Sequence, residues 1–294
     1  MKIKASELPL QAGGQIYHLN LHPEEIATKI ILVGDPGRVE DVSKHFDRID
    51  VKRQNRELVT HTGTFNHTPV TVLSTGMGTD NIDIVLNELD ALCNIDLKSM
   101  EIKEKHTSLT LVRVGTCGIL QPEIPLHAVI AAEYGLGMDG LLHFYKHENL
   151  SDENMVKAFV QHARWNECLP YPYCVPASRS LLDHIAVDMY KGITATAPGF
   201  FGPQGRETRA PLHYPHLNNS IESFEYHGHK ILNLEMETSA IYGLGALLKH
   251  QVLTCCLGIA NRVTKEFSSN YHAAMDNLID MVLDRLTRID ESRE

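Results

Sequence analysis

Two carboxylates flank a methionine in Glu235-Met236-Glu237, directly after the apolar run 230–234, which predicts a buried strand. Carboxylates are rarely buried without partners. At the carboxyl end of a strand, where α/β proteins place their ligands, such a pair indicates a bound polar ligand. The alternative is that both residues only stabilise the first turn of the helix pattern that follows. Taken alone, the segment slightly favours this second interpretation.

Three other predicted strand ends carry glycines, and two of these also carry an arginine. They are Gly34-Asp35-Pro36-Gly37-Arg38, Ser74-Thr75-Gly76-Met77-Gly78 and Arg113-Val114-Gly115-Thr116-Cys117-Gly118. Glycine lets a turn expose backbone N–H groups to an anion. Arginine presents a planar fork that matches phosphate oxygens. One such turn is an ordinary strand-to-helix connection, but three in one chain predict an anion site.

Gln204 and Arg206 lie close to Phe200 in the irregular segment 200–220, which is rich in glycine and proline. Glutamine offers one acceptor and two donors, and arginine offers donors only. Together they match a ring with carbonyl, N–H and carbonyl in sequence, which is uracil, and Phe200 could cover the ring face. Without further context, an exposed polar loop is the preferred interpretation of this segment.

Several familiar motifs are absent or unconvincing. The G-x-G-x-x-G pattern from Gly135 to Gly140 is followed by a poor helix start, so we expect a flexible loop there and no dinucleotide site. No phosphate-binding G-x-x-x-x-G-K-[ST] loop and no G-x-S-x-G elbow occur. The 17 histidines show no metal-ligand spacing, so no metal site is predicted.

The bulk composition is that of a globular protein of 294 residues with a formal net charge of −10. This charge argues against a nucleic-acid partner, although a few arginines in one cleft can still attract a small anion. No apolar run reaches the roughly 20 residues of a membrane helix, and the first residues show no secretory signal. The six cysteines form no C-x-x-C pair, which predicts reduced thiols in a cytoplasmic protein.

Alternating hydrophobic patterns predict an α/β fold with a largely parallel sheet in one domain, residues 1–294. Predicted strands are 29–33, 58–65, 69–74, 109–114, 127–132, 192–197, 230–234 and 252–260; predicted helices are 81–92, 152–164, 178–190, 238–250 and 271–289. The strand 109–114 is expected to end at Gly115, and Ser151 is expected to cap the helix that begins at Asp152. The segment 200–220 is expected to be a long surface loop.

The order of these motifs resembles the nucleoside phosphorylase-I superfamily, and the match looks closest to its uridine phosphorylases. The motifs are Gly34-Asp35-Pro36-x-Arg38-Val39, Ser74 to Gly78, Arg113-Val114-Gly115-Thr116-x-Gly118, Gln204-x-Arg206 and Glu235-Met236-Glu237. The resemblance runs from about Tyr17 to the last helix. It implies a single-domain three-layer α/β/α sandwich around a mixed, partly barrel-like central sheet.

The resemblance also implies site residues and partners. Phosphate would be held by Gly34, Arg38, Arg113 and Thr116, with Arg56 of the neighbouring subunit; ribose by Met236 and Glu237, with His18 of the neighbour; and uracil by Phe200, Gln204 and Arg206. Arg206, Gln204, Glu237 and Arg113 would carry the catalysis. Because the site is shared, a homodimer is the minimal unit implied. Inorganic phosphate is a co-substrate, and no metal or other cofactor is implied.

The implied reaction is the phosphorolysis of uridine to uracil and ribose 1-phosphate in pyrimidine salvage. Purine-cleaving relatives carry an aspartate where this chain has the segment 258–263, which contains none. The alternatives are a purine nucleoside phosphorylase or nucleosidase of the same superfamily, and a nucleoside-binding protein without activity. The sequence does not decide whether deoxyuridine and thymidine are also substrates or whether dimers assemble further. It also does not decide whether a monovalent cation binds at the dimer interface, or what the charged segment 96–106 does.

Overall fold

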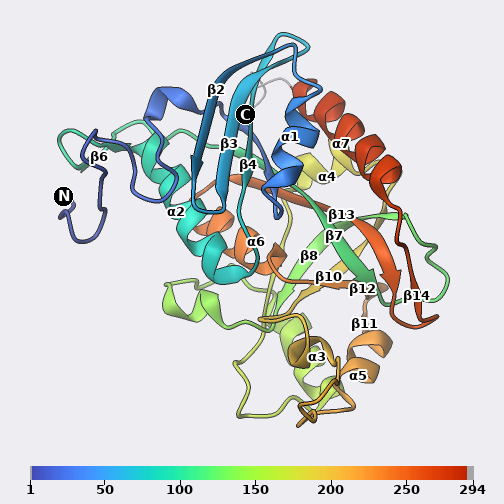
Figure 1. The fold of residues 1–294 in the computed structure, drawn as a ribbon. Coiled ribbons are helices and arrows are strands. Elements are labelled where there is room, and N and C mark those ends of the chain that lie inside the picture. The colour runs from blue at the N-terminus through green and yellow to red at the C-terminus, as the bar shows by residue number, and fades with distance from the viewer. Residues whose placement is uncertain (1, 290–294) are drawn as a thin grey trace.

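In the computed structural model, which describes residues 2–289, strands alternate with helices along most of the chain (Figure 1). The strands are β1 Lys29–Val33, β2 Arg48–Asn55, β3 Leu58–Phe65, β4 Thr68–Ser74, β5 Ile95–Asp96, β6 Glu101–Ile102, β7 Thr110–Ile119, β8 Val129–Gly137, β9 Tyr173–Pro176, β10 Tyr190–Thr196, β11 Glu225–Tyr226, β12 His229–Glu235, β13 Gln251–Asn261 and β14 Glu266–Phe267. The α-helices are α1 Gly37–Ser43, α2 Thr79–Asn94, α3 Glu153–Ala163, α4 Arg179–Ile185, α5 Leu217–Ser223, α6 Thr238–Leu247 and α7 His272–Thr287. The short 3-10 helices are η1 Pro23–Glu25, η2 Leu141–Phe144 and η3 Gly202–Gln204.

The central sheet is mixed and partly closes on itself. Strands β4, β1, β7 and β13 run parallel to one another, and so do β8, β10 and β12. The two parallel groups meet antiparallel at β13–β8 and again at β12–β7. These pairings close a ring of β7, β13, β8, β10 and β12, whereas β1, β4, β3 and β2 extend from it as an open sheet. The predicted partly barrel-like mixed sheet is therefore confirmed.

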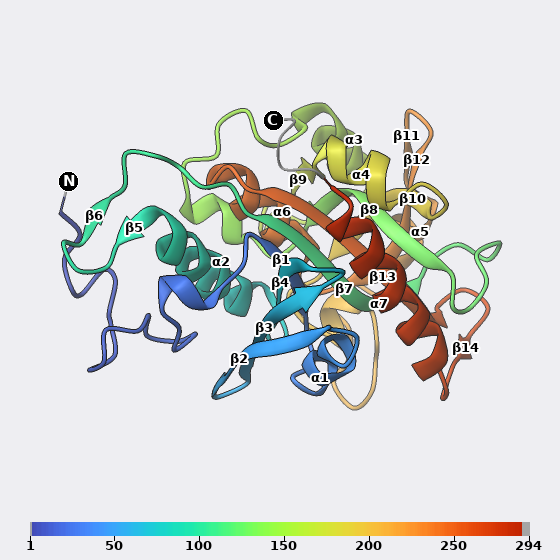
Figure 2. The same ribbon diagram turned by 90° about the horizontal axis from the view of Figure 1, so that it is seen from above.

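Helices cover both faces of this sheet, because its inner strands are apolar on both sides. Alternate residues of β1 show the division: Ile30 and Leu32 pack on the side of α2 and α6, and Ile31 and Val33 pack on the side of α1, α4 and α7. Figure 2 shows α2 and α7 on opposite sides of the strands. Helices α3 and α5 bury a further cluster against β8, β10 and β12. The three-layer α/β/α prediction is confirmed.

Strands β7 and β8 extend through glycines at which the sequence predicts a strand end or a loop. The expected strand end at Gly115 is wrong, because β7 continues to Ile119 and pairs with β13 along this whole length. The flexible loop expected at Gly135 is also wrong, since Gly135 and Gly137 belong to β8 and pair with β9 and β10. Glycine weakens a strand but does not end one when both neighbours supply hydrogen bonds.

Several boundaries and short elements also differ from the sequence predictions. The cap of α3 is Asp152, whose side chain accepts the N–H groups of residues 154 and 155, and the hydroxyl of Ser151 instead accepts the N–H of Cys174. The helix predicted over 178–190 ends at Ile185, and Tyr190 begins β10. The irregular segment 200–220 contains η3 and the start of α5. The sequence predictions also lack helices α1 and α5 and strands β2, β5, β6, β9, β11 and β14.

None of the helices in the described part of the chain is long and apolar enough to cross a membrane.

Candidate functional site

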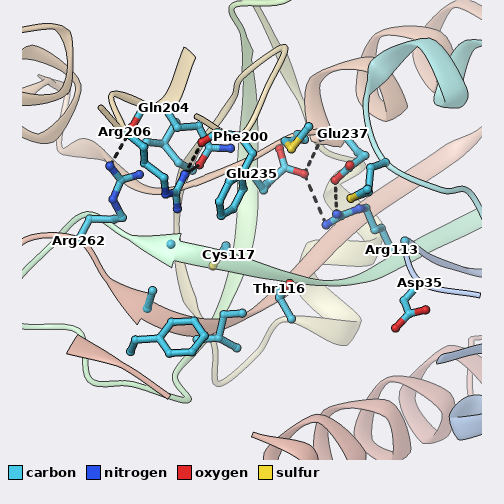
Figure 3. A pocket seen from close by; sticks show the side chains of 18 of the residues that line it. Asp35, Arg113, Thr116, Cys117, Phe200, Gln204, Arg206, Glu235, Glu237 and Arg262 are labelled. Atoms are coloured by element: carbon cyan, nitrogen blue, oxygen red, sulfur yellow. Dashed lines mark hydrogen bonds and ion pairs between the residues drawn. The ribbon is translucent and has the colours of Figure 1, made fainter. Parts of the chain in front are cut away.

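A cavity of about 980 Å³ opens where the carboxyl ends of β1, β4 and β12 meet β7 and β13. Open α/β sheets bind ligands at such strand ends. Nine of the predicted site residues line it: Gly34, Arg38, Arg113, Thr116, Phe200, Gln204, Arg206, Met236 and Glu237. Figure 3 shows Glu235 between two groups of side chains, with Phe200, Gln204 and Arg206 on one side and Arg113 with Glu237 on the other. Segments from Gly34 to Phe267 along the chain thus contribute to one site.

Arg113 and Glu237 form an ion pair in the wall of this cavity. Arg113 Nη2 donates to Glu237 Oε2, and both side chains are 5% exposed. Arg113 Nη1 lies 3.5 Å from Glu235 Oε2 and donates to Cys256 Sγ at 3.2 Å. Burial opposes the charge on Arg113, but Glu237, Cys256 and Glu235 outweigh it and raise the pKa of the guanidinium. Arg113 is therefore cationic, and these partners fix the orientation of its guanidinium group.

Glu235 caps the helix that follows it. Its carboxylate accepts the N–H groups of Glu237 and Thr238 at 2.9–3.1 Å and the hydroxyl of Thr196 at 2.6 Å. Burial and the nearby Glu237 raise the pKa of this carboxyl group. Glu237 differs, because among residues 2–289 its other oxygen accepts only the N–H of Gly78, at 2.8 Å. The helix-cap interpretation thus fits Glu235, whereas Glu237 also reaches the cavity beside Arg113.

Gly115 provides the space that Arg113 occupies. A Cβ atom on Gly115 would lie 2.0 Å from Arg113 Nη1 and 2.6 Å from Cζ, so the guanidinium folds back over this glycine. Arg38 approaches the same strand and donates to the backbone oxygen of Val114 at 3.4 Å. Burial and the charge of Arg113 lower the pKa of Arg38. Two partly desolvated arginines beside the glycine turn at Gly34 make this end of the cavity favourable for an anion.

Gln204 and Arg206 form one unit at the other end. Arg206 Nη1 donates at 2.6 Å both to Gln204 Oε1 and to the backbone oxygen of Phe200. The guanidinium carbon lies 3.8 Å from the centre of the Phe200 ring. Gly205 makes this turn possible, because its φ of +63° is a conformation that other residues rarely adopt. Burial and neighbouring Arg262 lower the pKa of Arg206 to about 10, so it stays charged at neutral pH.

Arg262 is a cavity residue that the sequence interpretation missed. It follows β13 directly, and its Nη2 donates to the backbone oxygen of Gln204 at 2.8 Å. Its Nη1 is buried without a hydrogen-bond partner among the described residues. A signal was present, because an arginine at the end of a predicted strand is the feature that drew attention to Arg38.

His18 and Arg56, the two residues expected from a neighbouring subunit, do not line the cavity of their own chain. His18 lies in the segment before η1, and Arg56 lies in the exposed turn between β2 and β3. Asn55 joins the two segments, because its Nδ2 donates to the backbone oxygen of His18 at 2.8 Å. The two residues therefore belong to one connected part of the surface.

Asp90, His106 and His250 bring three possible metal-ligand atoms within 4.8 Å of one another. However, His250 Nδ1 accepts the N–H of Leu109 at 3.1 Å, which places the ring proton on Nε2. That Nε2 faces Asp90 Oδ1 at 3.4 Å. A neutral imidazole held in this tautomer has no lone pair for a metal at Nε2, so the donor set does not fit a metal ion.

Comparisons with known proteins identify the family of the chain. The model of the phosphorylase superfamily matches residues 28–287. The uridine phosphorylase of Thermococcus kodakarensis is 27% identical over 275 residues, which cover 90% of this chain and 84% of that protein. The DeoD-type purine nucleoside phosphorylase of Oceanobacillus iheyensis is 25% identical over 274 residues, covering 92% and 99% of the two chains.

Among solved structures, a Trypanosoma brucei nucleoside phosphorylase described as showing uridine phosphorylase activity is similar over 96% of this chain and 100% of its own. The TM-score is 0.86, and the sequences are 31% identical. The chain thus shares its fold with that nucleoside phosphorylase. The chain belongs to the phosphorylase superfamily.

Proposed function

We propose that this protein catalyses the phosphorolysis of uridine to uracil and ribose 1-phosphate. The observation that carries the proposal is that the Gln204–Arg206 pair shares one cavity with Arg38, Arg113 and the Gly34 turn. One end of the cavity suits a uracil ring and the other suits phosphate. The similarity to the uridine phosphorylase of Thermococcus kodakarensis, and to the Trypanosoma brucei nucleoside phosphorylase described as showing uridine phosphorylase activity, supports the same activity.

In the proposed reaction, a phosphate oxygen attacks C1′ of the ribose as the bond from C1′ to the uracil nitrogen breaks. The electron pair of that bond leaves with uracil, so negative charge develops on the base. Arg206 is charged and lies beside Arg262, and it stabilises this charge where it forms. Water then protonates the uracil anion, since an arginine does not give up its proton at neutral pH.

Phosphate is proposed to bind at Gly34, Arg38, Arg113 and Thr116, and ribose at Met236 and Glu237. An ionised carboxylate accepts hydrogen bonds from sugar hydroxyls, and Glu237 is held for this by Arg113 and the N–H of Gly78. The same Arg113 is positioned for the phosphate, so one ion pair connects the two substrates. The mechanism requires no metal or organic cofactor.

A purine substrate is the second candidate, because the purine nucleoside phosphorylase of Oceanobacillus iheyensis aligns over almost the whole chain. Purified protein should be assayed with uridine, deoxyuridine, thymidine, inosine and methylthioadenosine, each with and without phosphate. Phosphate-dependent release of uracil from uridine is the expected result. Preferential cleavage of inosine would establish the purine alternative, and binding without any cleavage would indicate a silent nucleoside-binding protein.

We also propose that two subunits share each site, with His18 and Arg56 entering the cavity of the partner. Both residues lie outside their own cavity and are linked through Asn55. A doubly tagged hybrid of His18→Ala and Arg206→Ala subunits tests this. The hybrid should regain about half of the wild-type activity, because one of its two sites has every residue intact. Activity equal to the mean of the two parents would contradict a shared site.

We further propose that residues 1–294 form a single domain, since one 12-stranded sheet of the described residues includes both β1 and β14. The cytoplasmic location stays a prediction.

A further inference from the structure

We propose that Glu88 is a positioning residue that fixes His18 for the site of the partner subunit. This inference rests on the proposed function, in which His18 crosses to the partner's ribose. Glu88 lies on α2, 70 residues away from His18 in sequence, and its own side chain does not line the cavity. It would act on catalysis only through the histidine.

The carboxylate of Glu88 holds both the backbone and the ring of this segment. It accepts the N–H of His18 at 3.0 Å and the N–H of Leu19 at 2.8 Å. Glu88 Oε1 also lies 2.7 Å from His18 Nδ1. The carboxylate side chain is 7% exposed, whereas the histidine side chain is 27% exposed. The acidic group is therefore buried in the subunit while the ring it holds stays accessible.

These contacts set the tautomer of the ring. An ionised carboxylate only accepts hydrogen bonds, so Nδ1 must carry the proton that points at Glu88 Oε1. In the neutral ring, Nε2 then has a free lone pair, and no described residue forms a hydrogen bond with it. Such a nitrogen accepts a hydrogen bond from a ribose hydroxyl. Carboxylates fix the orientation and tautomer of metal-bound histidines in the same way.

Glutamine cannot replace Glu88 in this role, although it has nearly the same shape. Three N–H donors surround the carboxylate: the backbone of His18, the backbone of Leu19 and the His18 ring. An amide has one acceptor oxygen, so its NH₂ group would face at least one of these donors. Glu88→Gln should therefore turn the His18 ring away or reverse its tautomer.

The first experiment compares variants in steady-state kinetics. We expect Glu88→Gln and His18→Ala each to lower kcat/KM for uridine about tenfold, the loss of roughly one hydrogen bond. The KM for phosphate should not change. The double variant should be no worse than His18→Ala, because Glu88 acts through that ring. Multiplied losses in the double variant would overturn the proposal. Asp83→Asn is the matched control, because Asp83 lies on the same helix and contacts Tyr145 and Asn87 instead.

The second experiment determines which subunit's site loses activity when Glu88 is replaced. In a tagged hybrid of Glu88→Gln and Arg206→Ala subunits, the Arg206→Ala subunit donates an intact His18 to the intact cavity of the other. Recovery to about half of wild-type activity is expected. If the hybrid gives only the mean of its parents while the His18→Ala hybrid recovers, Glu88 serves its own cavity and the proposal fails. If neither hybrid recovers while wild-type protein cleaves uridine, the shared site itself is wrong, and the proposal fails with it.

A third measurement uses only the wild-type protein and does not depend on whether a variant folds. The ¹⁵N chemical shifts of the His18 ring in wild-type protein should show a proton on Nδ1 when the ring is neutral. A proton on Nε2 instead would overturn the assignment.

Discussion

Arg113 and Glu237 are 124 residues apart in sequence and form an ion pair in which both side chains are almost fully buried. In the proposed site, Arg113 binds phosphate and Glu237 binds ribose, so the pair connects the two substrates. Breaking a buried pair leaves an uncompensated charge, which generally costs about 3–5 kcal/mol. This relationship makes the function and the stability of the cavity inseparable at these two positions.

Arg113→Ala should therefore raise the phosphate KM and also lower the free energy of unfolding by about 3–5 kcal/mol. The reason is that Glu237 and Glu235 both lose their cationic neighbour. Phosphate-dependent kinetics and chemical denaturation check the two effects. Arg179→Ala is a suitable control, because its pair with Asp183 is exposed, and it should leave both quantities nearly unchanged. An unchanged phosphate dependence in Arg113→Ala would contradict its assignment.

Arg206→Ala should lower kcat for uridine about 10²–10³-fold, the usual effect of removing a donor at a developing negative charge. The KM for phosphate should change little, because Arg206 lies at the opposite end of the cavity (Figure 3). Steady-state kinetics with each substrate varied in turn separates the two effects. Arg206→Lys keeps the charge but loses the planar guanidinium that lies over the Phe200 ring, and it should fall between wild type and the alanine variant. Equal losses for uridine and phosphate would refute the role.

Arg262→Ala should lower kcat/KM for uridine roughly tenfold to hundredfold, corresponding to one charge-assisted hydrogen bond. Its Nη2 supports the backbone oxygen of Gln204, and Asn218 Nδ2 supports the same oxygen at 3.0 Å. Asn218→Ala removes only this second support, so comparing the two variants separates the charge of Arg262 from its hydrogen bond. If both variants lose activity equally, the charge of Arg262 adds nothing beyond holding the loop.

His61 should make folding stability depend on pH below about 6.5. Burial and the charge of Lys52 lower the pKa of His61 from its ordinary value of 6.5, while its Nδ1 bonds the hydroxyl of Ser43. The unfolded chain therefore binds a proton at a higher pH than the folded protein does. Stability from this group is complete above pH 6.5 and is lost as the pH falls toward the folded pKa, by at most about 1.4 kcal/mol per pH unit.

The measurement is the unfolding free energy of wild type and His61→Asn between pH 5 and 8. The difference between the two proteins should shrink as the pH falls below 6.5, because only the wild type carries the histidine. A difference that stays constant or grows toward acidic pH would contradict the lowered pKa.

The sequence by itself determined the fold class and most of the cavity. Apolar runs with period 2 or near 3.6 depend on local geometry, so β1, α2 and α7 could be located from residue types alone. The motifs at Gly34, Arg113 and Glu235 follow predicted strands, and the carboxyl ends of parallel strands gather at one edge of a sheet. That rule brings distant residues together without knowledge of their contacts.

Tertiary structure alone decided which partner each charged group meets. Neighbours along the chain do not reveal that Arg113 lies between Glu237, Glu235 and Cys256, that Glu88 holds His18, or that Arg262 supports Gln204. The continuation of β7 past Gly115 likewise depends on its pairing with β13. Hydrogen bonds and ion pairs act through space over a few ångströms, so they are set by how the elements pack and not by local sequence pattern.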